Sequence, residues 1–307
     1  MTFRSLRPLN LLMVALTQLV CWAYLRRSLP EGPFQVLGSF GLVILLVLST
    51  VCITAAGYLI NDVFDIAIDA LNKPRQALPD APELKQKTLR WYRVLNGLGL
   101  VLAVPVAYAS GKPALLVIQV LTILLLWAYS AWWKRLPVIG NLVVAALTAL
   151  SIALLYLYEP ALWGGGTIPF DASIRQHTTA ALLWLAAFAF ILTWMREMVK
   201  DIEDLDGDQA EGCRTLPIVW GIPNTVRLIA LLAGLVVGAL TATIVVEGML
   251  GNRKVVLIGL VFVVLLILPL AVWTLTLIRQ HTPAGFHRHS NLLKLLMLGG
   301  LICLWLL

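Results

Sequence analysis

Apolar segments long enough to cross a lipid bilayer recur about nine times along this 307-residue chain. Hydrophobic residues make up 60% of the sequence and charged residues only 13%, whereas soluble domains carry roughly 25% charged residues. Because about 20 consecutive apolar residues span the hydrocarbon core as a helix, each segment is predicted to be a transmembrane helix. The expected spans are residues 9–28, 36–60, 89–109, 113–133, 138–158, 179–198, 224–246, 255–278 and 291–307.

Basic residues are unevenly shared between the two sets of loops. If the amino terminus and the loops after the second and sixth spans lie on one side, that side holds most of the 23 lysines and arginines. The positive-inside rule then makes that side cytoplasmic. The chain shows no transit peptide, which favours an integral protein of the bacterial inner (cell) membrane. The net charge of +7 is explained by anionic membrane lipids, and no nucleic-acid partner is expected.

An acidic pattern occurs twice, each time where an apolar segment ends. The first copy is Asn61-Asp62-Val63-Phe64-Asp65-Ile66-Ala67-Ile68-Asp69. The second is Lys200-Asp201-Ile202-Glu203-Asp204-Leu205-Asp206-Gly207-Asp208. An offset of 139 positions pairs Asp62 with Asp201, Asp65 with Asp204, Asp69 with Asp208 and Arg75 with Arg214. Six of the 16 acidic residues occupy equivalent positions, although carboxylates are costly in a membrane.

This repeat completes the predicted fold class. We expect an all-α fold: a polytopic membrane bundle of about nine transmembrane helices, built from two related halves around a central cavity. The two acidic helix ends are expected to face each other across that cavity. Residues 1–307 are predicted to form a single integral-membrane domain, because no polar stretch is long enough to fold separately. The scattered cysteines show neither a metal spacing nor a disulfide framework, so they are interpreted as structural.

The acids and their neighbouring cations predict a site for a diphosphate. On a helix, Asn61, Asp65 and Asp69 would form one stripe, with Asp62 at its edge. Oxygen donors without histidine or cysteine favour Mg²⁺, which keeps several waters and shares phosphate oxygens. The neighbouring bases would bind free phosphate oxygens while an allylic lipid loses its diphosphate. The expected metal-binding residues are Asn61, Asp62, Asp65, Asp69, Asp201, Asp204 and Asp208.

Both acidic segments resemble motifs of a known family. The pattern Asn61-Asp62-x-x-Asp65-x-x-x-Asp69 resembles the first Asp-rich motif of the UbiA superfamily of intramembrane prenyltransferases. The second segment, followed by Arg214-Thr215-Leu216-Pro217, resembles its second motif. The resemblance covers effectively the whole chain and implies Mg²⁺-dependent transfer of a polyprenyl group from its diphosphate. It implies one metal at Asn61, Asp65 and Asp69, another at Asp201, Asp204 and Asp208, and catalytic roles for Asp65, Asp69, Asp204 and Asp208.

A third segment, Tyr129-Ser130-Ala131-Trp132-Trp133-Lys134, resembles the junction between the family's fourth and fifth helices. In the family, a tyrosine and a serine at this junction approach the reacting allylic end. The resemblance gives Tyr129 a catalytic role, because its hydroxyl and π-face would stabilise an allylic cation. A residue of the interfacial aromatic belt is the alternative. The expected substrate-binding residues are Arg75, Ser130, Lys134, Lys200 and Arg214.

The acceptor is predicted from the residues around the motifs. Asn72-Lys73-Pro74-x-x-x-Leu78-Pro79 and the Lys-Asp-Ile-Glu-Asp form look more like enzymes that prenylate a glycerol-phosphate lipid than like quinone-ring enzymes. The resemblance implies geranylgeranylglycerol phosphate as acceptor, in ether-lipid synthesis. An aromatic acceptor, such as a quinone or chlorophyll-type precursor, is the alternative. A cation-coupled transporter is the alternative from another class, but it would place acids near mid-span.

Other polar residues have blander interpretations. Arg7 is interpreted as a positive-inside anchor rather than as a contact to an acceptor's headgroup. His281, His287 and His289 are expected in a solvated loop that faces lipid headgroups. Glu159, like Asp171 and Glu247, is expected to be a loop residue on the opposite face of the membrane.

Overall fold

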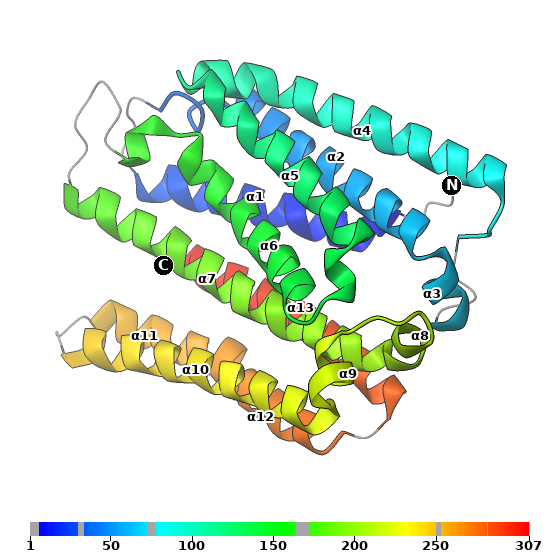
Figure 1. The fold of residues 1–307 in the computed structure, drawn as a ribbon. Coiled ribbons are helices and arrows are strands. Elements are labelled where there is room, and N and C mark those ends of the chain that lie inside the picture. Colours follow the sequence, from blue (N-terminus) through cyan, green and yellow to red (C-terminus); the bar gives the residue numbers. More distant parts are fainter. Residues whose placement is uncertain are drawn as a thin grey trace. The chain divides into compact units, whose positions relative to one another are not determined.

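The computed structural model describes residues 6–29, 34–72, 78–163, 172–249, 253–280 and 282–306 (Figure 1). Within these ranges all regular elements are helical, and nine helical segments are long and apolar enough to cross a membrane. The all-α class and the predicted number of spans are therefore confirmed. The spans are formed by α1 (Pro8–Ser28), α2 (Phe40–Phe64), α4 (Pro82–Ala109), α5 (Leu116–Ala131), α6 (Ile139–Leu157), α7 (Ala172–Glu203), α10 (Ile222–Met249), α11 (Arg253–Phe262) continued by α12 (Leu268–Ile278), and α13 (Pro283–Leu306).

Several helix bounds differ from the apolar segments of the sequence. α4 begins at Pro82 rather than near residue 89, and α7 begins at Ala172 rather than near 179. Each of these helices carries a polar first part, which hydropathy alone does not count as part of a span. A π-helical stretch, Val263–Ile267, joins α11 to α12. It precedes Pro269, whose ring lacks an N–H and clashes with the carbonyl four residues earlier, so the regular hydrogen-bond ladder is interrupted there.

The chain divides into two compact units, Met1–Lys134 with Leu150–Leu183, and Arg135–Ala149 with Trp184–Leu307. That the whole chain acts as one domain stays a prediction. In the first unit, α2 packs along α4 and also contacts α1 and α5 (Figure 1). The Ser49 hydroxyl of α2 donates a hydrogen bond of 2.7 Å to the Gly99 carbonyl of α4. A Cβ atom at Gly99 would lie 2.7 Å from Ile53 Cγ1, so this glycine sets the separation of the two helices.

Glu159 lies between α6 and the 3₁₀ turn Pro160–Trp163, a loop position as predicted, but its side chain is fully buried. Its Oε2 accepts hydrogen bonds of 2.9 Å from the backbone N–H groups of Val36 and Leu37. Its Oε1 accepts from Gln35 and Ala161 at 3.2 and 3.3 Å. The carboxylate thus joins the segment before α2 to the segment after α6, and backbone amides replace the water that a buried anion loses.

The neighbouring Tyr158 is anchored in the same unit. Its hydroxyl donates a hydrogen bond of 2.7 Å to Gln119 Oε1, and burial raises the pKa of this tyrosine to about 12. The phenol therefore stays protonated at physiological pH and remains a hydrogen-bond donor.

In the second unit, α10 packs against α11 and α12 (Figure 1). The apolar core of this unit joins these helices to α7 and α13, and Met195, Trp273 and Leu293 are among its buried residues. The Trp273 indole N–H donates a hydrogen bond of 3.1 Å to the His289 carbonyl. His287 and His289 lie in α13 rather than in a loop, so the prediction of a loop is wrong for both; His289 is buried, whereas His287 is exposed to solvent as predicted. His281 lies outside the described residues.

The close contact between α2 and α4 gives a stability prediction. Gly99→Val is expected to lower the free energy of unfolding by about 1–3 kcal/mol, because the larger side chain forces the packed helices apart. Gly97→Val on the same helix is the matched control, since a Cβ there meets nothing within 4 Å. Thermal unfolding of both variants in detergent checks the difference. Equal melting temperatures for the two variants would contradict the proposed contact.

Candidate functional site

The first acidic segment is interrupted at its middle acid. α2 ends at Phe64, the short helix α3 (Ile66–Asn72) follows, and Asp65 lies between them with φ −97° and ψ 7°. The Asp69 N–H still donates to the Asp65 carbonyl at 2.7 Å, so the chain keeps its direction. The expectation of a stripe on one uninterrupted helix is corrected by this break.

The second acidic segment has the same break. α7 ends at Glu203, α8 (Leu205–Ala210) follows, and Asp204 lies between them with φ −93° and ψ 10°. The Asp208 N–H donates to the Asp204 carbonyl at 3.1 Å. Asp65 and Asp204 are the residues that the 139-position offset pairs. The sequence repeat is therefore also a repeat of backbone conformation.

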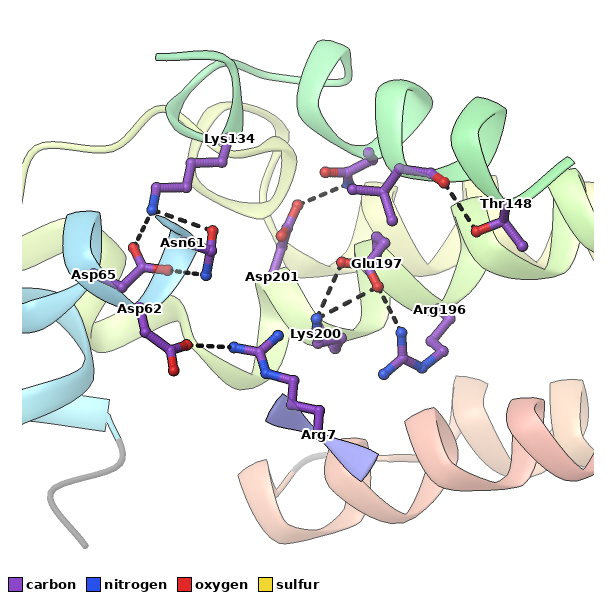
Figure 2. Close-up of polar contacts among 12 residues, drawn as sticks. Arg7, Asn61, Asp62, Asp65, Lys134, Thr148, Arg196, Glu197, Lys200 and Asp201 are labelled. Carbon is purple, nitrogen blue, oxygen red and sulfur yellow. Dashed lines mark hydrogen bonds and ion pairs between the residues drawn. The ribbon is translucent and has the colours of Figure 1, made fainter. Parts of the chain in front are cut away.

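Lys134 binds the middle acid of the first segment (Figure 2). It lies in the 3₁₀ turn Trp133–Arg135 after α5, and its Nζ contacts Asp65 Oδ1 in a short ion pair. The same Nζ donates to Asn61 Oδ1 at 3.4 Å, while Asn61 Nδ2 donates to Asp65 Oδ2 at 2.5 Å. The Lys134 and Asp65 side chains are only 10% and 13% exposed, so water screens this pair weakly. The predicted substrate-binding residue Lys134 thus forms an ion pair with the predicted metal ligand Asp65.

Arg7 binds the first acid of the same segment, so it is more than a positive-inside anchor. Its Nη2 donates to Asp62 Oδ1 at 3.1 Å (Figure 2), and its guanidinium carbon lies 4.9 Å from the centre of the Tyr58 ring. Burial lowers the pKa of Arg7, but Asp62, Tyr58 and the other two acids raise it more, and the net shift is upward. Arg7 therefore remains a permanent cation beside Asp62.

The second segment places an amide where the first has a guanidinium. Asn141 Nδ2 of α6 donates to Asp201 Oδ2 at 2.8 Å, and Asp201 is the equivalent of Asp62. α1 and α6 also begin alike, because Arg7 (φ 48°) precedes α1 and Val138 (φ 68°) precedes α6. In the described ranges these are the non-glycine residues with left-handed backbone. In each half, the start of a helix therefore supplies a donor to the first acid.

Glu197 is a functional candidate that sequence reasoning missed. It is 6% exposed and lies one turn before Asp201 on α7. Its Oε1 accepts from Arg196 Nη1 at 2.7 Å, and its Oε2 accepts from Lys200 Nζ at 3.1 Å (Figure 2). The repeat could not reveal it, because the offset pairs Glu197 with Tyr58 rather than with an acid. An acid flanked by two bases inside an apolar helix was the available signal.

The other predicted substrate-binding residues lie in less telling environments. Tyr129 and Ser130 are in the last turn of α5, where Ser130 is buried and donates to its own helix at the Leu126 carbonyl, 2.9 Å away. The Arg214 side chain is exposed, and its backbone N–H donates to the Arg135 carbonyl at 2.8 Å. Arg75 lies outside the described residues.

The oxygen donors of the first segment fit a metal shared with substrate. Within the ranges that the structure describes, no group of three or more histidine, cysteine, aspartate or glutamate side chains could hold a metal ion. Asn61 Oδ1 and Asp65 Oδ1 both converge on the Lys134 ammonium, which shows that a cation is bound by these two oxygens. Mg²⁺ is suited to so small a set, because it keeps several waters and is completed by substrate phosphates.

Comparison with known proteins identifies a family that this chain matches. The profile of the UbiA prenyltransferase family matches residues 11–293. The digeranylgeranylglyceryl phosphate synthase of Sulfolobus acidocaldarius is 31% identical over 250 residues, which cover 81% of this chain and 80% of that protein.

Two solved structures share the fold. One comes from structural work on digeranylgeranylglyceryl phosphate synthase in membranes, with 24% identity, a TM-score of 0.60 and coverage of 98% of this chain and 94% of that one. The other is a UbiA homologue from Archaeoglobus fulgidus bound to DMAPP and Mg²⁺, with 15% identity, a TM-score of 0.59 and 98% coverage of each chain.

The buried contacts of Glu197 give a second prediction. Glu197→Gln is expected to lower the free energy of unfolding by about 3 kcal/mol, because it leaves Arg196 and Lys200 without their shared carboxylate. Glu203→Gln, on the same helix, is the control, since Glu203 pairs with a His287 side chain that is 61% exposed. Its loss should stay below about 1 kcal/mol. Thermal unfolding in detergent measures both values, and a larger loss for Glu203→Gln would refute the assignment.

Proposed function

The chain belongs to the UbiA prenyltransferase family, and we propose that it transfers a polyprenyl group from its diphosphate to geranylgeranylglycerol phosphate. That it is a membrane prenyltransferase follows from the family and from the nine apolar spans in the described residues. The observation that carries the finer proposal is the 31% identity, over four fifths of both chains, to a digeranylgeranylglyceryl phosphate synthase. Because the chain belongs to a prenyltransferase family, we set aside the alternative of a cation-coupled transporter.

The acidic segments supply the metal ligands in this proposal. Asn61, Asp65 and Asp69 bind one Mg²⁺, and Asp201, Asp204 and Asp208 bind another. When bound, the metal neutralises the negative charge that develops on the departing diphosphate. Asp62, at the edge of the first set, is also assigned to the metal, and one of its oxygens accepts a hydrogen bond from Arg7. The support for metal ligation is the oxygen-only donor set and the cation that Asn61 and Asp65 already bind.

The basic residues bind the phosphate oxygens that remain free. Lys134 contacts a predicted ligand and Lys200 directly precedes one in the sequence, and we assign this role to them together with Arg75 and Arg214. Ser130 is assigned to the diphosphate and Tyr129 to the allylic end, where its π-face would stabilise positive charge. Both assignments rest on the family resemblance of the segment that ends at Lys134.

The bond changes of the reaction balance without a further reagent. The bond between the allylic carbon and the diphosphate oxygen breaks, and the diphosphate leaves with the electron pair. The acceptor's hydroxyl oxygen forms an ether bond to that carbon. Its proton passes to a carboxylate or to a diphosphate oxygen. The apolar side chains of the spans exclude the water that would otherwise capture the carbocation.

We also propose the side of the membrane on which this occurs. The acidic segments are followed or flanked by basic residues, and the positive-inside rule assigns such loops to the cytoplasm. The cell membrane of a bacterium remains our proposal for the location.

Loss of one carboxylate from either segment should remove activity. Asp65→Asn and Asp204→Asn are each expected to lower kcat/KM by about 100-fold or more, because each removes charge that stabilises the departing diphosphate. Asp206→Asn is the matched control: Asp206 is exposed and has no acidic equivalent in the first segment. Release of inorganic diphosphate by detergent-purified protein measures the effect. Retained activity in Asp65→Asn would exclude Asp65 from the site.

The acceptor is tested by direct competition. Purified protein receives Mg²⁺, radiolabelled geranylgeranyl diphosphate, geranylgeranylglycerol phosphate and 4-hydroxybenzoate together, and the products are separated. We expect label in the glycerol-phosphate lipid and none in Asp65→Ala or Asp204→Ala. Label on the aromatic ring would overturn the acceptor and keep prenyl transfer.

A further inference from the structure

Lys134 binds two oxygen atoms that the proposed function assigns to a divalent metal. We propose that Lys134 is an internal competitor of the metal at the first acidic segment, and that metal binding frees its ammonium for the donor's diphosphate. This inference rests on the proposed function, because it concerns how the same site is filled. It adds a second, opposing role to a lysine that would otherwise be an ordinary phosphate-binding residue.

The geometry of three side chains carries the inference. The Lys134 ammonium is bound by Asn61 Oδ1 and Asp65 Oδ1 together. The Asn61 amide is fixed in this orientation, because its Nδ2 donates to the other oxygen of Asp65. Both oxygens therefore point at the ammonium. The ammonium occupies a lone pair on each of these oxygens, and its positive charge repels a divalent metal at the same two atoms, so the two cations compete there.

The environment makes this exclusion energetically significant. Both charged side chains of the pair are nearly buried, at 10% and 13% exposure, so their attraction and the repulsion between lysine and metal are weakly screened. Lysine is suited to moving, because its charge sits at the end of a flexible four-carbon chain. The freed ammonium remains beside the metal and would meet the phosphate oxygens there.

The second acidic segment offers an internal comparison. Its own lysine, Lys200, occupies the position equivalent to Asn61. Glu197 holds the Lys200 ammonium through both carboxylate oxygens, at 3.1 and 3.4 Å. Glu197 is not one of the repeated acids. The lysine of one segment is therefore bound to a predicted metal ligand, whereas the lysine of the other is bound to a separate carboxylate.

The inference predicts two effects of opposite sign from one substitution. Removing the Lys134 charge should strengthen metal binding, because the metal no longer displaces an ion pair. The same change should weaken binding of diphosphate to the metal-loaded protein, because the freed ammonium is missing. If Lys134 only bound phosphate, its removal would weaken diphosphate binding but would not strengthen metal binding at the Asn61 and Asp65 oxygens.

Metal affinity is measured first, on the full chain in detergent, by the electron paramagnetic resonance signal of free Mn²⁺. Lys134→Met is expected to bind one Mn²⁺ about tenfold more tightly than the unaltered protein, the equivalent of about 1.4 kcal/mol. Two variants control for charge alone. Arg196→Met and Lys200→Met each remove a cation from Glu197, which is not a predicted metal ligand, and neither frees the Asn61 and Asp65 oxygens. Each should change the affinity by less than about threefold.

Binding of inorganic diphosphate is measured next, by calorimetry at saturating Mn²⁺. Lys134→Met should bind it about tenfold more weakly, as expected for the loss of one charge-assisted contact. Lys134→Arg keeps the charge and should retain weak metal binding, and Lys134→Gln repeats the test if the methionine variant does not fold. Circular dichroism verifies the fold of each variant.

The outcomes separate this inference from the proposed function. Equal tightening of Mn²⁺ in all three charge-removing variants would reduce the effect to general electrostatics and overturn the competition. Unchanged or weaker Mn²⁺ binding in Lys134→Met would overturn it as well. Tighter Mn²⁺ binding with unchanged diphosphate binding would overturn the transfer of the ammonium. If the Mn²⁺ and diphosphate measurements give the expected results but the protein transfers no prenyl group, the proposed function is overturned and the competition stands.

Discussion

Compensation of buried carboxylates organises both halves of this protein. An uncompensated carboxylate in an apolar bundle is costly, so each acid near a helix end requires a donor that the fold brings to it. Arg7 donates a hydrogen bond to Asp62, Lys134 donates to Asp65, and Asn141 donates to Asp201. The same requirement applies to the buried carboxylate of Glu159, where backbone amide donors take the place of a cation. Within each unit, a helix start or a junction between helices lies where it meets this need.

The spans and the repeat were predictable because they depend on local composition. About 20 apolar residues specify a transmembrane helix without reference to any partner, and a constant offset relates two copies of one motif. The first residues of α4 and α7 were not predictable in this way, since both helices begin with polar residues that the hydropathy of a span does not include. The breaks at Asp65 and Asp204 also escaped, because a single non-helical residue leaves the apolar periodicity unchanged.

Partners distant in sequence explain most of what could not be predicted at the site. Asp65 and Lys134 are 69 positions apart, and Asp201 and Asn141 are 60 apart. No local pattern chooses one lysine among many for such a contact. Glu197 is different, because both of its partners lie within one turn of the same helix. The sequence therefore contained the signal for this pair, but Glu197 has no acidic equivalent in the repeat.

The two acidic segments share their backbone and differ in charge, and this difference bears on the proposed chemistry. Equivalent acids face a guanidinium in one segment and a neutral amide in the other, and equivalent lead positions hold Asn61 and Lys200. Two identical cation sites would suit a symmetric ligand. An allylic diphosphate is not symmetric, because one phosphate is esterified to the carbon that reacts and the other carries the terminal charge. Two segments with the same backbone and unequal charges therefore offer two different environments to an anion, which a strict repeat of side chains could not do.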